Sequence, residues 1–296
     1  MACSRGATGS CSIRATLEAT RRSHRFIDDV GMAEGDTVHA TADRLHVALA
    51  GRTFTRTDFR VPRAATTDLS GQAVRAVAAR GKHLLIRTDA ELSIHSHLGM
   101  DGSWRVYVPG ERWHGRAFEV RAVLEAATAV VVGHRLRTLE VIRTKTEPQL
   151  LEHLGPDVLG PDWDAAEAVR RLEGSLDREI GEALIDQAVM AGPGNVYRSE
   201  VCFLAGVDPR TPASKIEDPA RLVGLMKTAM EANRGGGRRV TTGDRRPGHE
   251  LWVYGRRGRP CRRCGTPIRS FEQGETRRIV FVCPSCQPVD ERGTDG

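Results

Sequence analysis

The sequence has no apolar run of membrane-spanning length, no apolar core of a signal peptide near its start and no internal repeat. Because a bilayer-spanning helix needs about 20 mostly apolar residues, no membrane span is predicted. Lysine is scarce as well: it supplies only four of the 44 basic residues, namely Lys82, Lys145, Lys215 and Lys227. The arginine bias is best explained by genome composition, but it draws attention to a lysine in a motif position.

The chain is long enough for about two domains, since it has 296 residues and 40% of them are hydrophobic. A formal net charge of +6 and a sequence pI near 9.1 are compatible with a polyanionic partner. Net charge alone is weak evidence, because many proteins are mildly basic. Composition therefore predicts a globular, basic, two-domain protein and leaves its partner open.

Four of the seven cysteines form two doublets, Cys261-x-x-Cys264 and Cys283-x-x-Cys286, with eighteen residues between them. Four thiolates at this spacing can surround one Zn²⁺ tetrahedrally, and the intervening residues suffice for a β-hairpin but not for a core of its own. The alternative is a pair of disulfides. No second oxidised framework accompanies the doublets, so one structural zinc ion is predicted.

Arginine is concentrated next to these cysteines. Residues 234–263 contain ten arginines against two acids, Asp244 and Glu250, and the predicted hairpin carries Arg277 and Arg278. Guanidinium groups on a rigid hairpin suit bidentate contact with phosphate oxygens. Nucleic acid is thus the leading inference for the partner, and a solvated basic surface is the alternative.

The pattern of apolar residues predicts an α+β protein with two domains. Residues 34–50 are predicted to form an amphipathic helix that stops at Gly51. Short alternating or apolar runs follow, separated by Gly, Pro and Asp, and indicate a two-layer β-sandwich. The predicted strands are 74–77, 83–87, 92–97, 104–108, 118–124 and 129–132.

Helices are predicted after Pro148, so the joint between the two domains is placed near residue 145. The predicted helices are 149–154, 164–172, 178–190, 196–204 and 219–233. The predicted organisation is an extension at 1–31 that is disordered or precedes the true start, a β-sandwich domain at 32–145, a helical domain at 146–240, a loop and zinc hairpin at 241–288, and a tail at 289–296.

A glycine-rich turn, Ala191-Gly192-Pro193-Gly194-Asn195, separates two of these helices. Such a turn allows a tight helix-turn-helix whose second helix begins with free N–H groups beside Asn195, a site suited to phosphate. An ordinary capped helical hairpin is the alternative, and this segment alone favours it.

In this order, the helix, β-sandwich, glycine-rich helix-turn-helix and Cys₄ hairpin resemble the Fpg/Nei family of DNA glycosylase/AP lyases (formamidopyrimidine-DNA glycosylase and endonuclease VIII), closest to its Nei branch. Four segments carry the resemblance: MAEGDTV at 32–38, RGKHLL at 80–85, DQAVMAGPGNVY at 186–197 and the hairpin at 260–287. The resemblance implies a helix-two-turn-helix fold for residues 146–240 and a catalytic role for the β-sandwich domain.

The resemblance also implies a mechanism. A damaged base is flipped out of the duplex, an N-terminal amine attacks C1′ of its deoxyribose, and elimination from the resulting Schiff base cuts the strand. Ala33 stands at the nucleophile position and Glu34 at that of the acid/base residue. Without the resemblance, Glu34 is simply a carboxylate favoured at a helix N-terminus.

Further positions match residues with which the family binds DNA. Lys82, Asn195 and Arg278 match phosphate-binding residues near the lesion, and the resemblance therefore also implies that Lys82 and Arg278 belong to the catalytic site. Met100 matches a residue that some members insert into the gap left by the flipped base, although ordinary packing explains a methionine after a strand equally well. The implied partner is double-stranded DNA with oxidised bases or abasic sites, bound by a monomer in the bacterial cytoplasm at the nucleoid.

The sequence departs from the family at the nucleophile, where Ala33 replaces the usual proline. If residue 32 precedes Ala33 in the mature chain, the nitrogen of Ala33 is part of an amide and cannot form a Schiff base. If translation starts at Met32, removal of that methionine exposes a primary amine. Our hypothesis is that the functional chain begins at Ala33.

Three functions are compatible with these features. The first is a bifunctional base-excision repair enzyme that removes oxidised bases, with pyrimidines favoured by the Nei resemblance. The second is a catalytically weak or inactive reader of damaged DNA with the same fold. The third, unrelated to repair, is a zinc-ribbon protein that binds RNA or the ribosome.

Overall fold

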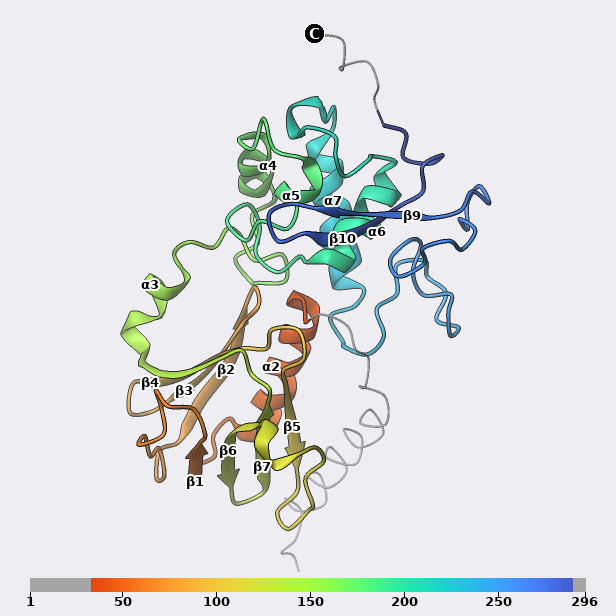
Figure 1. The fold of residues 1–296 in the computed structure, drawn as a ribbon. Helices are drawn as coiled ribbons and strands as arrows, with labels where there is room; N and C mark the ends of the chain where they lie inside the picture. The colour runs from red at the N-terminus through yellow and green to blue at the C-terminus, as the bar shows by residue number, and fades with distance from the viewer. Residues whose placement is uncertain (1–32, 290–296) are drawn as a thin grey trace, which may run out of the picture.

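The computed structural model describes residues 33–289, which form a β-sandwich lobe and a helical lobe (Figure 1). The expectations for residues 1–31 and for nearly all of the tail lie outside this range. Within it, no helix has the length and apolar character that a bilayer crossing requires. The α+β, two-domain architecture predicted from the sequence is confirmed.

Helix α2 (Gly35–Leu49) opens the described chain and packs on the β-sandwich. Its buried face includes Val38, Leu45 and Leu49, which recur at helical spacing. The helix ends before Gly51, whose φ of 73° lies in the left-handed region that glycine adopts without strain. The helix predicted at 34–50 is confirmed.

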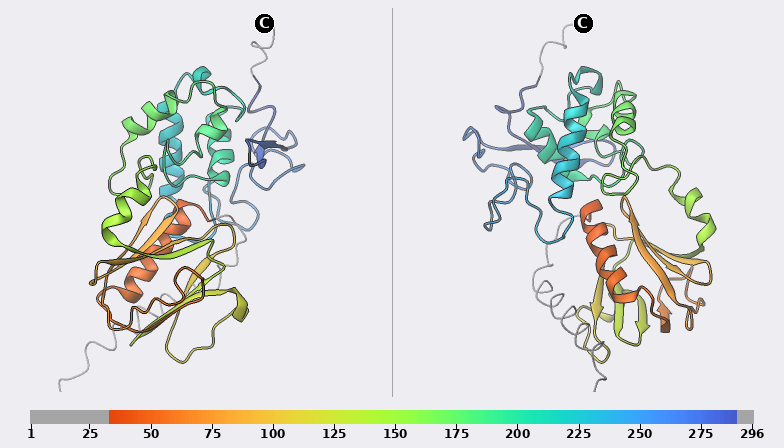
Figure 2. Two further views of the ribbon diagram at one scale, coloured as in Figure 1. Left: turned by 60° about the vertical axis from the view of Figure 1, so that its left-hand side comes forward. Right: turned by 180° about the vertical axis from the view of Figure 1, so that it is seen from behind.

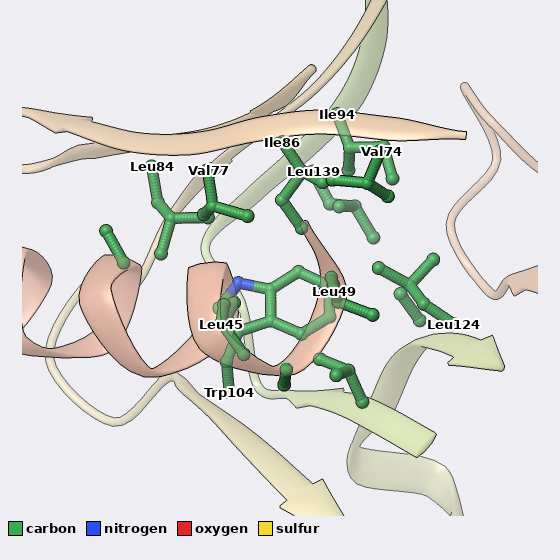
Figure 3. Close-up of a cluster of buried hydrophobic side chains, with 14 of the residues drawn as sticks. Leu45, Leu49, Val74, Val77, Leu84, Ile86, Ile94, Trp104, Leu124 and Leu139 are labelled. Carbon is green, nitrogen blue, oxygen red and sulfur yellow. The ribbon is translucent and has the colours of Figure 1, made fainter. Parts of the chain in front are cut away.

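The sandwich consists of two antiparallel four-stranded sheets, ordered β1-β6-β7-β5 and β2-β3-β4-β8. Their strands are β1 (Phe54–Phe59), β2 (Val74–Arg80), β3 (His83–Thr88), β4 (Leu92–His97), β5 (Ser103–Tyr107), β6 (Val120–Ala126), β7 (Ala129–His134) and β8 (Thr138–Arg143). Figure 3 shows side chains of α2, among them Leu45 and Leu49, meeting Ile86 of one sheet and Leu124 of the other. One core therefore holds the helix and both sheets together.

Two strands, β1 and β8, are missing from the sequence prediction. In β1 only the end residues Phe54 and Phe59 are buried, and in β8 only Leu139 is. Both strands lie at the edge of a sheet, where one side of the strand needs no neighbour and apolar alternation is weak. The predicted strand at 118–124 begins only at Val120, because Ala117–Glu119 form a 3₁₀ turn.

The connection between the lobes contains the 3₁₀ turn Thr144–Thr146 and the short helix α3 (Glu147–Leu151). Glu147 is buried and accepts hydrogen bonds from the Arg87 guanidinium, at 2.7 Å from Nη2, and from the Ser93 hydroxyl at 2.5 Å. These contacts fasten the connection to the outer face of the second sheet. The predicted helix at 149–154 exists, but two to three residues earlier.

The helical lobe contains α4 (Ala165–Glu173), α5 (Ile180–Ala183), α6 (Asn195–Ala205) and α7 (Pro219–Glu231). The long helix predicted at 178–190 is wrong, because only its beginning is helical. From Gln187 onward the backbone pairs with another segment: the Gln187 carbonyl accepts from Gly155 N at 2.8 Å, and Ala191 N donates to Pro156 O at 2.9 Å. Turn hydrogen bonds within residues 185–190, together with this pairing, thus take the place of a continuous helix.

The C-terminal hairpin consists of β9 (Arg269–Gln273) and β10 (Arg278–Val282), and it lies between the cysteine doublets as predicted. It packs beside α6 (Figure 1). The segment before it is fastened by Glu200 of α6. This buried carboxylate accepts hydrogen bonds from the backbone N–H groups of Trp252, Val253 and Tyr254, at 2.8 to 2.9 Å. One side chain therefore anchors the segment that leads to the hairpin on α6.

The two lobes meet where the start of α2 and the β2–β3 turn reach the helical lobe (Figure 2). Asp157, fully buried, lies in this contact: its carboxylate bonds His39 Nε2 at 3.0 Å, Gly81 N at 2.8 Å and Leu159 N at 3.0 Å. Burial alone would raise the pKa of Asp157, but the hydrogen bond and charge of His39 and the two N–H groups lower it overall. The carboxylate thus links α2, a strand turn and the helical lobe.

We expect Asp157→Ala to lower the free energy of unfolding by about 2–4 kcal/mol, because it leaves two buried N–H groups and His39 without their acceptor. Asp162→Ala is the matched control: it removes an ion pair with Arg80 in which the Asp162 side chain is 56% exposed, and should cost at most about 1 kcal/mol. Urea unfolding curves of both variants measure the difference. Equal losses would contradict the role given to Asp157.

Candidate functional site

The carboxylate of Glu34 lies at the beginning of helix α6. Glu34 is 1% exposed, and its two oxygens accept hydrogen bonds from Gly194 N at 3.0 Å and Val196 N at 2.8 Å. A helix N-terminus favours an anion because its first N–H groups lack partners inside the helix. The protein's own glutamate therefore occupies these N–H groups, which are not free to bind a phosphate.

Glycine makes this close approach possible. A Cβ atom built on Gly194 would lie 2.5 Å from Cδ of Glu34, and one built on Gly35 would lie 2.8 Å from Cα of Gly192. The backbone is joined here as well, because Gly35 N donates to Gly192 O at 2.9 Å. Residues 34 and 35 thus pack directly against the glycine-rich turn and are hydrogen-bonded to it.

Ala33 directly precedes Glu34 and is partly buried against the core of the β-sandwich lobe. Its position is set by its neighbours, since Glu34 and Gly35 are both hydrogen-bonded to the turn at 192–196. The structure therefore holds the nitrogen of Ala33 one residue away from a buried carboxylate.

Lys82 occupies the turn between β2 and β3 and reaches the same glycine-rich turn. Its Nζ donates to Pro193 O at 2.6 Å, and a Cβ on the preceding Gly81 would lie 2.9 Å from Cβ of Ala191. Burial lowers the pKa of Lys82 to about 8, the charge of Glu34 opposes this, and Arg278 adds to the lowering. Lys82, Glu34 and Arg278 therefore share one electrostatic environment.

Asn195 and Arg278 are brought together by the contact of α6 with the hairpin. The Asn195 amide donates to the carbonyl of Ile279 at 2.8 Å, and its oxygen accepts a hydrogen bond from the buried Arg198. Arg278, the neighbour of Ile279, is exposed at the first position of β10. The buried asparagine thus positions the strand that presents this arginine.

Met100 lies apart from the buried group, in the loop between β4 and β5. It is 67% exposed, while Leu98 of the same loop is buried in the core. The loop is closed by a hydrogen bond from Gly102 N to Leu98 O at 3.0 Å. The methionine is therefore an apolar side chain held out in solvent on an anchored loop.

Several residues that shape the site were not found from the sequence. Asp36, 3% exposed, accepts two hydrogen bonds from the Arg239 guanidinium at 2.7 and 2.9 Å and one from the Tyr197 hydroxyl at 2.9 Å. These contacts tie α2, α6 and the segment after α7 together. A lone aspartate in the first helical turn and one arginine among many gave no signal of this pairing.

A pocket of about 440 Å³ lies beside this pairing, between α2 and residues 236–259. Thr37, Arg44, Arg239 and Tyr254 are among the residues that line it. Val196, whose N–H binds Glu34, lines it too. The pocket therefore begins next to the buried carboxylate.

The four cysteines of the two doublets form a cluster at the end of the hairpin. Their sulfur atoms all lie within 4.8 Å of one another, with Cys261 and Cys286 at 3.9 Å and Cys264 and Cys283 at 3.4 Å. This cluster is close enough to bind one metal ion, as the doublet spacing predicted.

Comparison with known proteins agrees with this architecture. Residues 32–140 match the formamidopyrimidine-DNA glycosylase N-terminal domain, and residues 154–237 match the formamidopyrimidine-DNA glycosylase H2TH domain. The chain is 52% identical to a probable endonuclease 8 2 of Streptomyces coelicolor over 86% of this chain and 94% of that protein. It is 48% identical to the DNA-(apurinic or apyrimidinic site) lyase Nei2 of Mycolicibacterium smegmatis, over 86% and 99%.

Among solved structures, the chain resembles a Lactococcus lactis formamidopyrimidine-DNA glycosylase in complex with DNA that contains an abasic site. The TM-score is 0.73 at 25% identity, over 86% of this chain and all of the other. A second crystal structure of that L. lactis enzyme, bound non-covalently to DNA with an AP site, matches with the same TM-score at 24% identity. These likenesses extend over both lobes.

We expect Gly194→Ala to lower the free energy of unfolding by about 1–3 kcal/mol, since the added methyl group has to displace the Glu34 carboxylate. Gly224→Ala in α7 is the control, because a Cβ there meets nothing within 4 Å and alanine favours a helix by about 0.5–1 kcal/mol. Thermal and urea unfolding compare the two variants. A Gly194→Ala protein as stable as the control would show that the approach of Glu34 is not tight.

Proposed function

Because the chain belongs to the Fpg/Nei family of DNA glycosylases, we propose that it is a base-excision repair enzyme that removes oxidised pyrimidines through a Schiff-base intermediate and then cuts the strand. The observation that carries this proposal is the buried Glu34 carboxylate, held beside Ala33 by the start of α6. The similarity to proteins named endonuclease 8 and Nei2 supports glycosylase and AP-lyase activity. The two alternatives, a catalytically weak or inactive reader and an RNA-binding zinc ribbon, are not favoured for the same reason.

In the proposed reaction the α-amino group of Ala33 attacks C1′ of the damaged nucleotide. An α-amine has a pKa of about 7.7–8.0, so a useful fraction is neutral and nucleophilic at neutral pH. Glu34 protonates the sugar ring oxygen and later carries protons during elimination. The amine exists only if the mature chain starts at Ala33, and we propose that it does.

The DNA strand is held by residues around this centre. We assign phosphate contacts to Lys82, Arg278 and Asn195, whose side chains lie around the start of α6 and the first residues of β10. Met100 would fill the gap left by the everted base, which suits its exposed position on an anchored loop. The pocket between α2 and residues 236–259 is then the candidate site for the base.

The cysteine cluster is proposed to hold one structural Zn²⁺. With Zn–S bonds of about 2.3 Å, tetrahedral coordination separates the sulfurs by about 3.8 Å. The observed separations of 3.4 and 3.9 Å fit this geometry. The metal would supply no chemistry to the reaction. It would fix the hairpin that carries Arg278.

We propose double-stranded DNA with oxidised bases or abasic sites as the partner, bound by a single copy of the chain in the bacterial cytoplasm at the nucleoid. The likeness to L. lactis enzymes bound to abasic-site or lesion-containing DNA supports the choice of DNA. The arginines of residues 234–263 supply the matching charge.

The experiment that tests the function is borohydride trapping on a duplex with one abasic site. A chain that begins at Ala33 should form a covalent complex, and Ala33→Pro should raise the yield, because proline supplies a secondary amine in a fixed ring. Glu34→Gln should lower the rate of strand cleavage by about 10²–10⁴-fold, because the amide cannot carry the proton. Denaturing gels measure both.

Two results would count against this proposal. If neither the chain beginning at Ala33 nor its Ala33→Pro variant is trapped, the protein binds DNA without lyase chemistry. If the intact mass of the natively produced protein shows that residues 1–31 are retained, Ala33 is not the natural nucleophile.

Removal of the metal gives a separate expectation. Cys283→Ser should lower the zinc content and weaken DNA binding while the β-sandwich lobe stays folded, because that lobe has a core of its own. Ser285→Ala, an exposed position in the same turn, should change neither property. Metal analysis, fluorescence anisotropy and circular dichroism measure the three quantities. Complete loss of the dichroism signal in Cys283→Ser would contradict the independence of the two parts.

A further inference from the structure

The site contains a second amine, which does not depend on where the chain starts. We propose that Nζ of Lys82 also forms a Schiff base and takes the C1′ aldehyde of an abasic site when the nitrogen of Ala33 is bonded to Met32. The inference rests on the proposed AP-lyase function of the same site. It gives Lys82 a chemical role in addition to the phosphate contact assigned above.

The geometry places this amine at the glycine-rich turn that Glu34 and Gly35 also contact. Nζ of Lys82 is 2.6 Å from Pro193 O, while Gly35 N is bonded to Gly192 O and Glu34 to Gly194 N. Lys82 and the two residues that follow Ala33 therefore contact three consecutive residues from two different segments. The charge of Glu34 acts on Lys82 as well, so the amine and the carboxylate belong to the same site.

The bonding of Lys82 permits a neutral amine. Its hydrogen bond goes to a neutral carbonyl, and among residues 33–289 no carboxylate oxygen lies within 4.0 Å of Nζ as an ion-pair partner. A neutral amine can still donate this hydrogen bond, so loss of the proton breaks no ion pair. Lys227, by contrast, pairs with Glu231 at 2.9 Å.

Burial and the surrounding charges together lower the pKa of Lys82 and so favour loss of its proton. Burial lowers the pKa of Lys82 to about 8, with Glu34 and Asp36 of α2 opposing the shift and Arg278 and Arg239 adding to it. Two imidazoles of the adjoining strands, His83 and His97, also lie near it: burial lowers their pKa values to about 3 and about 4, with a contribution from the charge of Lys82. Both are therefore neutral when Lys82 titrates.

The reaction is that of an amine with an aldehyde. The lone pair of neutral Nζ forms a bond to C1′, and a proton moves from the nitrogen to the aldehyde oxygen. The carbinolamine then takes up a proton and releases its hydroxyl group as water, which gives the iminium ion. Loss of the proton at C2′, which Glu34 can accept, delivers an electron pair that expels the 3′ phosphate as the C3′–O bond breaks. Hydrolysis of the iminium returns the free amine.

The scarcity of lysine makes the inference directly testable. Two forms are compared: the full 296-residue chain, with the Met32–Ala33 bond verified by intact mass, and a chain that begins at Ala33. Each is mixed with a duplex carrying one abasic site and reduced with sodium borohydride, and the modified peptide is identified by mass spectrometry. The full chain should be modified on Lys82, and the shorter chain on the α-amine of Ala33.

Lys82→Arg keeps the positive charge but removes the nucleophile, so it should lower trapping of the full chain by at least about tenfold. Lys215→Arg, an exposed position, is the matched control. Trapping of the full chain should rise with pH through about 8, because the neutral form of Lys82 increases there. Thermal unfolding shows whether Lys82→Arg is folded; if it is not, peptide identification in the unmodified sequence decides alone.

The outcomes separate this inference from the proposed function. A full chain that is not trapped, or is modified elsewhere, while the shorter chain is trapped at Ala33, overturns the role of Lys82 and leaves the lyase intact. If neither form is trapped, the proposed lyase chemistry and this inference fall together.

Discussion

A buried carboxylate must find hydrogen-bond donors, and Glu34 finds them outside its own helix. It binds the first N–H groups of α6, in the other lobe, through Gly194 and Val196. This one interaction places the start of α2 and requires a glycine at residue 194. It also determines where Ala33 lies and gives the proposed acid/base residue a fixed position before DNA arrives.

Buried polar side chains lie in the contact between the two lobes. Asp157 joins His39 to the β2–β3 turn, and Asp36 joins Arg239 to Tyr197, all with buried or nearly buried carboxylates. Buried ion pairs contribute little net stability, because desolvation offsets their attraction. They do tolerate only a narrow geometry. Here they fix the relative position of two lobes that each have a separate apolar core.

The C-terminal hairpin is likewise held in position by contacts with side chains from other segments. Glu200 fixes the segment that leads into it, the cysteine cluster closes its far end, and Asn195 binds the strand next to Arg278. Two of these contacts come from helix α6 and the third from the cysteine doublets. The strand that carries the exposed arginine is thus fixed by helix α6 and by the cysteine cluster, which suits a side chain proposed to bind a phosphate.

Local patterns in the sequence were sufficient for the elements and for the metal cluster. Helix α2, six strands of the sandwich, the hairpin and the four cysteines follow from spacing, because neighbouring residues determine periodicity and doublets. The edge strands β1 and β8 were not predicted, because they bury few side chains. The helix predicted at 178–190 is interrupted by pairing with residues 155–158.

What the sequence determined alone was thus the inventory: Ala33, Glu34, Lys82, Asn195, Arg278 and Met100 are visible as candidates, together with the four cysteines. Only the tertiary structure decided that Glu34 fills the start of α6, and that Lys82 approaches the same turn as Glu34 and Gly35. It alone paired Asp36 with Arg239, more than two hundred positions away. The reason is physical: a buried charge is satisfied by whichever donors the fold brings near, and sequence separation carries no information about them.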